Sequence, residues 1–328
     1  MGIYTIEHGY QKSKLKKRAF TTLFSLTLLI GGGGFLVKQY PIQPPQPTGG
    51  RVEALSQSSP PAPKITTPLP WPTYGQSAYG VAGEGITAVS DDDIKAVPIA
   101  SLAKVITALA VLKEKPLAPG EQGPMITLTE EDVALYNNYL SKDGSVALVE
   151  PDEKISQYQA LQAMLMPSAN NITDSLVIWA FGSMDAYTAY ANKMVNELGL
   201  QKTSVADASG FSASTTGSAN DMVKLGLVYM QDPVLRDIAK QTEASIPVAG
   251  IIQNYNSVSN KQNLLGIKVG NTDEAGRCFM LANVHSNGSS KDVVSVTVVL
   301  GAPNLDIAMK DAQAVIAAGD AAYDQLPL

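Results

Sequence analysis

The chain has 328 residues, of which 45% are hydrophobic and 16% charged, so it is long and apolar enough for one or two globular domains. Its single cysteine excludes an internal disulfide, and its two histidines argue against a histidine metal cluster and a Ser-His-Asp hydrolase. The net charge of −6 is uneven: residues 1–40 carry +5, which leaves −11 for the rest and argues against nucleic-acid binding. We expect neither a metal nor another cofactor.

The N-terminal segment combines a basic tail, residues 1–18, with an apolar run, residues 19–37. The run has 19 residues without a charge, which at about 1.5 Å per residue is just long enough to cross the hydrocarbon core of a membrane. The basic tail predicts a cytoplasmic N-terminus. No clean small-x-small cleavage site follows the run, so we favour an uncleaved transmembrane anchor over a cleaved signal peptide. Both interpretations export the rest of the chain, so we expect a cell-membrane protein with its main domain outside the cytoplasm.

Proline dominates the next stretch, since ten of the 20 prolines lie between residues 41 and 73. This composition is typical of a semi-rigid, extended linker that has no packed core. We therefore predict a cytoplasmic tail at 1–18, an anchor at 19–37, a linker at 38–74 and an extracytoplasmic domain at 75–328.

The extracytoplasmic domain has strand-like patterns at its two ends and helical patterns between them. Short apolar runs predict strands at 77–81, 85–89, 264–270, 277–284 and 292–300. Helical spacing of apolar residues predicts helices at 101–114, 156–166, 170–181, 185–198, 218–230 and 306–323. We expect an α+β fold in which strands from both ends share one antiparallel sheet, with helices packed on it and a helical lobe inserted.

One predicted helix carries a lysine inside an apolar run. Ser101 and Lys104 are three residues apart, so their side chains lie on one face of the helix. The helix is apolar on almost every side, and burial lowers the pKa of a lysine. A deprotonated Lys104 can take the proton of Ser101 and activate it as a nucleophile without a histidine. The alternative is a helical lysine that reaches water past its neighbours.

A serine–lysine site of this kind also needs a group that relays protons and a cation that holds an acidic substrate. Two short motifs that could supply them, Ser-x-Asn and Lys-x-Gly, follow in that order. Ser168-Ala169-Asn170 lies in a break between two predicted helices, and Lys268-Val269-Gly270 lies in a predicted strand. The same short patterns also occur elsewhere by chance, so only the ordered combination is specific. The chance matches are Ser13 to Lys16, Ser218 to Asn220, Lys142 to Gly144 and Lys224 to Gly226.

These motifs resemble those of the D-alanyl-D-alanine carboxypeptidase family of low-molecular-mass penicillin-binding proteins. The similar stretches are PIASLAKVITALAVL, AMLMPSANN, SGFSASTTGSANDMVKLG and LLGIKVGNTDEAG. The resemblance runs from about residue 78 to about residue 302, most of the extracytoplasmic domain. The resemblance implies the fold of serine β-lactamases and DD-peptidases, a five-stranded antiparallel sheet flanked by helices. It also implies a peptidoglycan stem peptide ending in D-Ala-D-Ala as substrate, with β-lactam antibiotics as covalent inhibitors.

The resemblance also implies a role for each matching residue. Ser101 is the expected acylated nucleophile, Lys104 its general base, and Ser168 the relay that protonates the leaving amine. The expected oxyanion hole consists of the backbone N–H groups of Ser101 and Asn271. The full set of expected substrate-binding residues is Asn170, Lys268, Gly270, Asn271 and Thr272.

The third motif departs from the family pattern, which has Lys-Thr-Gly where this chain has Lys-Val-Gly. In the family the threonine hydroxyl resembles a second donor to the substrate carboxylate, and Val269 lacks it. A lost hydrogen bond to a charged group costs about 1.5–3 kcal/mol, or roughly 10- to 150-fold in rate. We expect a weakened but working enzyme, in which Thr272 is the nearest substitute donor.

Three alternatives stay open. A non-catalytic or weakly active penicillin-binding module is consistent with Val269. A serine β-lactamase needs a deacylating acid, for which Glu197 is the nearest glutamate after Asn170. A transpeptidase passes the same acyl group to an amine instead of water, and the sequence does not distinguish these acceptors.

Overall fold

The computed structural model describes residues 64–91, 94–258, 263–286 and 292–326. The predicted basic tail, the anchor and most of the linker lie outside these residues. Within the described ranges, no helix is long and apolar enough to cross a membrane. Part of the predicted linker is described, and there Leu69 is buried while the Ile65 N–H donates to the Thr87 carbonyl at 3.1 Å.

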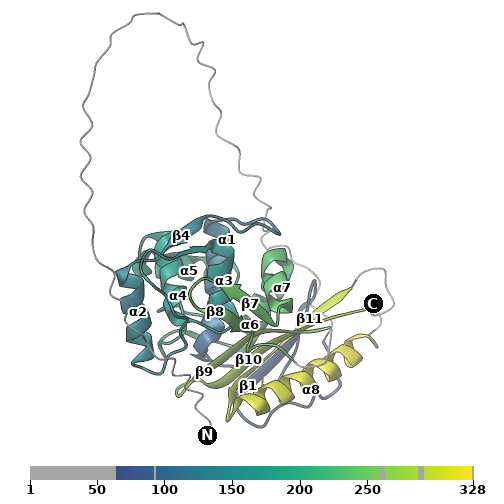
Figure 1. Cartoon of the computed structure of the whole chain (residues 1–328). Helices are drawn as coiled ribbons and strands as arrows, with labels where there is room; N and C mark the ends of the chain where they lie inside the picture. The colour runs from purple at the N-terminus through teal and green to yellow at the C-terminus, as the bar shows by residue number, and fades with distance from the viewer. Residues whose placement is uncertain (1–63, 92–93, 259–262, 287–291, 327–328) are drawn as a thin grey trace, which may run out of the picture. The chain divides into compact units, whose positions relative to one another are not determined.

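Five antiparallel strands from both ends of the domain form its central sheet (Figure 1). Their spatial order is β2-β1-β11-β10-β9, which confirms the prediction that the two ends share one sheet. The strands are β1 Gln76–Val81, β2 Gly85–Val89, β9 Leu264–Thr272, β10 Gly276–His285 and β11 Val293–Ala302. Strand β9 lies at the edge of the sheet, next to β10 alone, and this edge position becomes important at the site.

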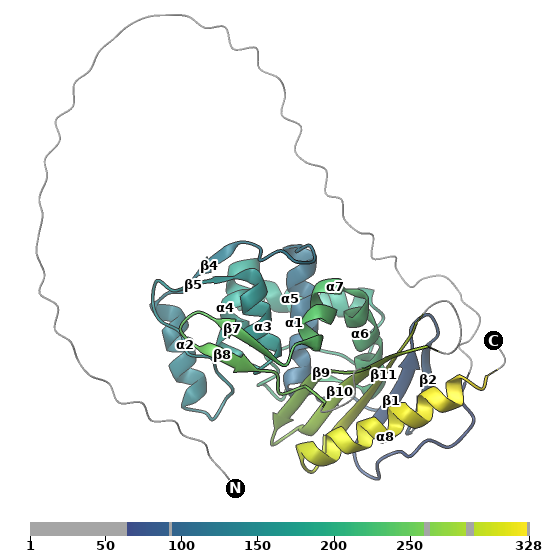
Figure 2. The same ribbon diagram turned by 45° about the vertical axis from the view of Figure 1, so that its right-hand side comes forward.

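The sheet is buried on both faces, which explains why its strands are almost continuously apolar. Along β10, Cys278 and Met280 belong to the larger apolar cluster, whereas Phe279 and Leu281 belong to a second cluster on the other face. This alternation is the period of two that a strand imposes on its side chains. Figures 1 and 2 show α8, Leu305–Tyr323, along one face of the sheet and the other helices on the opposite face.

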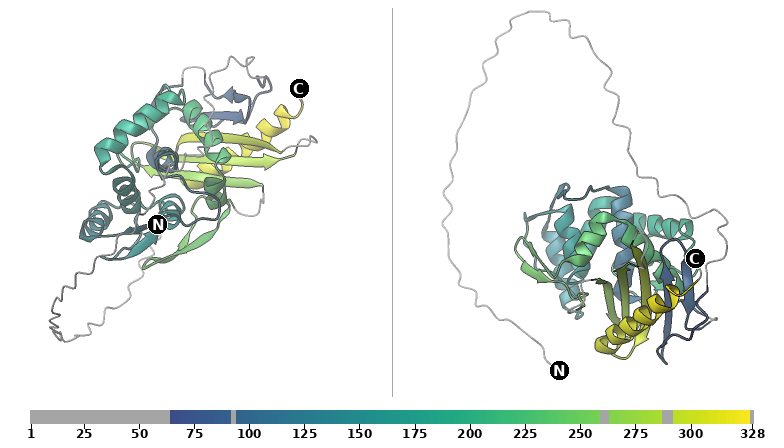
Figure 3. Two further views of the ribbon diagram at one scale, coloured as in Figure 1. Left: turned by 90° about the horizontal axis from the view of Figure 1, so that it is seen from above. Right: turned by 90° about the vertical axis from the view of Figure 1, so that its right-hand side faces the viewer.

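The helices that face α8 across the sheet form the inserted lobe, and Figure 3 shows this separation from two further directions. All six predicted helices are present within a few residues of their expected ends. The helices besides α8 are α1 Ala103–Glu114, α2 Glu130–Leu140, α3 Gln157–Leu165, α4 Asn170–Phe181, α5 Met184–Glu197, α6 Ala219–Gln231 and α7 Pro233–Lys240. Helices α2 and α7 and the short strands of the lobe were not predicted from the sequence.

Three two-stranded ribbons complete the described part of the domain. They are β3 Val97–Pro98 with β6 Thr216–Gly217, β4 Met125–Thr127 with β5 Lys154–Ser156, and β7 Glu243–Ile246 with β8 Gly250–Gln253. The predicted helix at 101–114 differs from the structure at its start. A 3₁₀ turn, Ala100–Leu102, precedes α1, so Ser101 lies in that turn and Lys104 in the first turn of α1.

Candidate active site

The serine and lysine of the first motif are in direct contact. Lys104 Nζ lies 3.0 Å from Ser101 Oγ, because the 3₁₀ turn and the first turn of α1 present both side chains to the same side. Ala100, directly before Ser101, has a φ of +46°, a conformation that is unfavourable for a residue with a Cβ. Such local strain is common where the chain must present a functional side chain in a defined direction.

Lys104 is fully buried, so the alternative in which its amine reaches water is wrong. Its Nζ donates to Asn170 Oδ1 at 2.7 Å and to the Ser209 carbonyl at 2.9 Å, which fixes it beside Ser101. Burial lowers the pKa of Lys104 to about 7, although the carboxylates of Asp207 and Asp174 act in the opposite direction. A large share of Lys104 is therefore neutral near pH 7, when its lone pair can accept the serine proton.

The second motif lies where α3 ends and α4 begins. Ser168 has a φ of +66°, again unusual for a residue with a Cβ, and its side chain is buried. Its Oγ has no hydrogen-bond partner among the residues that the structure describes. Two residues later, Asn170 begins α4 and its side chain contacts Lys104 as described above. The motif therefore supplies one hydroxyl without a protein partner and one amide that holds the lysine.

The third motif lies on the edge strand β9. Lys268 is fully buried, and its Nζ donates to Asn256 Oδ1 at 3.3 Å. Burial first, and the positive charge of Lys104 second, hold the pKa of Lys268 well below its ordinary value. Because β9 packs against the 3₁₀ turn that carries Ser101, the first and third motifs share one site.

The free edge of β9 lies beside the turn that carries Ser101. A Cβ added to Gly270 would come within 3.1 Å of Ala100 Cβ and of Leu102 Cδ1, so glycine permits this close approach. The Val269 N–H points away from β10, because it donates to Asn256 Oδ1 at 2.8 Å. N–H groups two residues apart on a strand point to the same side, so the Asn271 N–H also faces the free edge. This geometry is compatible with an oxyanion hole made by the N–H groups of Ser101 and Asn271.

Val269 and the nearby Thr272 make contacts that stabilise the fold. Val269 is half-buried and packs against the apolar cluster beneath α8. Thr272 Oγ1 accepts a hydrogen bond from the Ala275 N–H at 3.1 Å, in the turn between β9 and β10. Thr272 therefore already supports this turn.

Several residues around Lys104 were missed by the sequence analysis. Asp174 lies one helical turn after Asn170, and its Oδ2 accepts from the Tyr139 hydroxyl at 2.8 Å. Burial raises the pKa of Asp174 to about 6. Asp207 accepts from the Phe211 N–H at 2.9 Å and from the Ser209 hydroxyl at 3.0 Å, which orders the loop whose carbonyl holds Lys104. Asp174 follows Asn170 by four residues, so it could have been placed on the same face of the predicted helix from the sequence. Asp207 lies in a loop, where no such spacing marks a residue as part of the site.

The glutamate that a β-lactamase would use and two of the chance motif matches lie away from the three motifs. Glu197 is exposed at the end of α5 and forms an ion pair with Lys113 at 2.9 Å, with no contact to the three motifs. Ser218 caps α6 by accepting from the Asp221 N–H at 3.2 Å. Lys224 Nζ donates to the Gly199 carbonyl at 3.2 Å.

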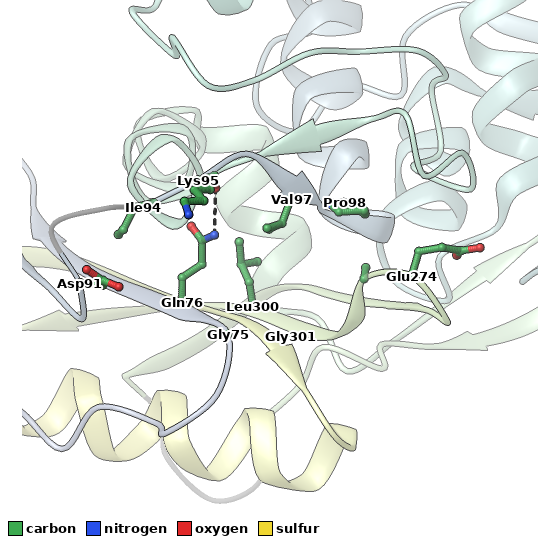
Figure 4. Close-up of a pocket in the computed structure, with 11 residues that line it drawn as sticks. Gly75, Gln76, Asp91, Ile94, Lys95, Val97, Pro98, Glu274, Leu300 and Gly301 are labelled. Carbon is green, nitrogen blue, oxygen red and sulfur yellow. Dashed lines mark hydrogen bonds between the residues drawn. The ribbon is translucent and has the colours of Figure 1, made fainter.

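A pocket of about 380 Å³ lies beside β3 and is lined by none of the residues of the three motifs (Figure 4). Ile94, Val97 and Leu300 give it an apolar lining. The side-chain amide of Gln76 within it is already paired, since it donates to the Lys95 carbonyl at 2.9 Å. We assign this pocket no role in the chemistry of the site.

Residues 85–304, more than half of the chain, match the family model described as D-alanyl-D-alanine carboxypeptidase. The chain belongs to this family. The family's curated relatives include D-alanyl-D-alanine carboxypeptidase DacA of Escherichia coli, which is 28% identical over 195 residues, 58% of this chain and 48% of the relative. A D-alanyl-D-alanine endopeptidase of Pseudomonas aeruginosa is 26% identical over 236 residues, 70% of this chain and 73% of the relative. The chain thus spans about half the length of DacA and most of the endopeptidase.

Solved structures of the D-alanyl-D-alanine carboxypeptidase family and of related DD-peptidases share the fold. A carboxypeptidase of Mycobacterium tuberculosis superposes with a TM-score of 0.67 at 21% identity, and covers 81% of this chain and 96% of its own. A Streptomyces DD-transpeptidase superposes with a TM-score of 0.65 at 18% identity, and covers 75% of this chain and 96% of its own. The predicted DD-peptidase fold is therefore confirmed.

The two Ser-Ala-Asn segments provide a matched test of the second motif. We expect Ser168→Ala to slow acylation by a fluorescent penicillin by about 100-fold, the typical effect of losing one proton-transfer group. Ser218→Ala is expected to leave acylation unchanged and to lower the free energy of unfolding by about 1 kcal/mol, because it removes only a helix cap. Stopped-flow labelling and urea unfolding measure the two effects. Equal acylation rates in the two variants would contradict the assignment of Ser168.

Proposed function

We propose that this protein is a serine-type D-Ala-D-Ala carboxypeptidase that removes the terminal D-alanine from peptidoglycan stem pentapeptides. The observation that carries the proposal is the buried Lys104 amine, 3.0 Å from the Ser101 hydroxyl, in a member of a DD-peptidase family. The name of the Escherichia coli relative supports the same reaction. Because the Pseudomonas relative is called an endopeptidase, cleavage of D-alanyl bonds within cross-links is the second candidate.

Acylation begins with the neutral Lys104 amine. Lys104 Nζ removes the proton of Ser101 Oγ, and the oxygen attacks the carbonyl carbon of the penultimate D-alanine. The carbonyl oxygen becomes an oxyanion, which the N–H groups of Ser101 and Asn271 stabilise.

Collapse of the oxyanion breaks the peptide bond to the last D-alanine. The leaving nitrogen takes a proton from the Ser168 hydroxyl, and Ser168 is reprotonated from the Lys104 ammonium. Free D-alanine leaves, and the remaining peptide is an ester of Ser101. Water then attacks this ester with Lys104 again as base, which releases the shortened peptide and restores the Ser101 hydroxyl.

Lys268 binds the negative end of the substrate. A carboxylate bound at this buried amine favours its protonated form, because an opposite charge raises the pKa that burial has lowered. Asn170 Oδ1 is held by Lys104, so the Nδ2 end of the amide binds the substrate backbone. β-Lactam antibiotics carry an acyl carbon and a carboxylate in a similar arrangement, so they acylate Ser101 as covalent inhibitors.

We also propose that the protein is attached to the cell membrane by residues 19–37, with its catalytic domain outside the cytoplasm. The support is the charge-free run, the basic tail before it and the proline-rich linker after it. This placement would bring the catalytic domain to the peptidoglycan. A chain lacking residues 1–40 should then appear in the soluble fraction, and its persistence in washed membranes would contradict the anchor.

The decisive experiment is mass spectrometry of products formed by the full chain in detergent. A pentapeptide muropeptide is expected to lose one D-alanine, and a cross-linked muropeptide dimer is expected to stay intact. Cleavage of the dimer would replace the carboxypeptidase with the endopeptidase. A new cross-linked product would identify a transpeptidase, whereas penicillin labelling without any product would identify a binding module. Rapid turnover of penicillin would instead favour a β-lactamase.

A further inference from the structure

Asn256 belongs to none of the three motifs, yet its side chain contacts the third motif and the end of the helix that precedes the second. It precedes β9 and is 2% exposed. Its Oδ1 accepts from Lys268 Nζ at 3.3 Å and from the Val269 N–H at 2.8 Å. Its Nδ2 donates to the Leu165 carbonyl and to Asn254 Oδ1, both at 2.9 Å. All four contacts suit only one orientation of the amide, because the oxygen faces donors and the nitrogen faces acceptors.

The contact with Leu165 reaches the segment that carries Ser168. Leu165 is the last residue of α3, where helix carbonyls have no partner within the helix. The Tyr255 N–H donates to the next carbonyl, that of Met166, at 3.2 Å. Residues 255–256 therefore close the end of α3 directly before Ser168, and Asn256 connects this segment to the strand that carries Lys268.

The approach of Asn256 to β9 depends on the backbone of the strand. A Cβ added to Gly266 would lie 1.6 Å from the Asn256 carbonyl oxygen, so any other residue there would displace Asn256. Gly266 is two residues before Lys268 in the same strand. Glycine at position 266 therefore leaves the space that the backbone of Asn256 occupies.

The chemistry of the amide distinguishes it from other acceptors. An amide oxygen fixes the position of Lys268 Nζ without supplying a negative charge. An aspartate of the same shape would form an ion pair with the buried lysine, and such charge-assisted bonds are about twice as strong as neutral ones. It would then compete with the carboxylate of the substrate for the same cation.

We propose that Asn256 is a positioning residue, which holds Lys268 through a neutral acceptor so that its charge stays available to the substrate carboxylate, and which fixes the Ser168 segment beside it. The inference rests on the proposed function only in that the ligand is an acyl donor with a carboxylate. A structural role alone would affect ligands with and without a carboxylate equally. The two roles are therefore separable by a pair of ligands.

The test uses full-length protein with benzylpenicillin and benzylpenicillin methyl ester, and follows acylation by intact-protein mass spectrometry. Asn256→Asp is expected to lower the second-order acylation rate constant for benzylpenicillin by about 10-fold or more, the equivalent of one charge-assisted hydrogen bond. For the methyl ester we expect a smaller loss, due only to the missing Nδ2 bonds to the Leu165 carbonyl and Asn254, so the preference for the carboxylate is reduced. Asn304→Asp, which exchanges one good cap of α8 for another, adds the same charge and should change neither rate constant.

Asn256→Ser keeps the position neutral and is the second variant in case Asn256→Asp does not fold. It removes the hydrogen bonds by which the side chain links α3 to β9, so we expect acylation by both ligands to slow. The preference for the carboxylate should be reduced less than in Asn256→Asp. Equal losses for both ligands in Asn256→Asp, or unchanged rate constants in both variants, would overturn the proposal. Acylation of the wild type without release of D-alanine would overturn the proposed function and leave this inference intact, whereas no acylation at all would overturn both.

Discussion

Ser101→Ala is expected to abolish covalent labelling by a fluorescent penicillin and to lower release of D-alanine by at least about 1,000-fold. The substitution removes the oxygen that forms the acyl-enzyme in the proposed mechanism. It leaves Lys104 with its contacts to Asn170 and Ser209, so the fold should persist. Gel fluorescence measures labelling, and a coupled D-alanine assay measures turnover.

The matched control for this variant is Ser77→Ala in β1. Ser77 is fully buried, and its hydroxyl has no partner among the residues that the structure describes. We expect this variant to label and turn over like the wild type, with a similar thermal unfolding midpoint. Labelling of Ser101→Ala at the wild-type rate would show that another residue is the nucleophile, and it would remove the basis of the proposed mechanism.

The sheet and most helices were predictable because their signals are local. Each strand of the sheet is a short apolar run flanked by turn residues, and each predicted helix has apolar residues at helical spacing. In contrast, α2 has few buried residues, since among its side chains only Tyr139 is buried. A helix without a clear apolar face has no periodic signal, so its capping box at Thr129 and Asp132 was the remaining clue.

The site was predictable where the chemistry is concentrated in motifs. Ser101 and Lys104 are neighbours through local geometry, a 3₁₀ turn followed by the first turn of α1, so their contact was predictable from their three-residue spacing. The meeting of Lys104 with Asn170 and the Ser209 carbonyl depends on tertiary packing over 66 and 105 residues. Asn256 lies outside every motif, and only the fold brings it to Lys268.

The pH dependence of acylation follows from the burial of Lys104. The base must be neutral to accept the serine proton, and burial lowers its pKa to about 7. We therefore expect the acylation rate to be nearly constant well above pH 7 and to fall about tenfold per pH unit well below it. Lys104→Met, which keeps a similar length without a base, is expected to acylate at least about 1,000-fold more slowly at every pH.

The same shift predicts how stability depends on pH. In the unfolded chain Lys104 regains its ordinary pKa, so between about pH 7 and that value the unfolded state binds more protons than the folded state. The free energy of unfolding should therefore rise with pH across this window, and this contribution should be absent in Lys104→Met. Urea unfolding of both proteins at pH 7 and pH 9 measures the difference. If the two proteins gain the same stability over this interval, Lys104 is not a buried amine with a lowered pKa, and the proposed base catalysis loses its physical cause.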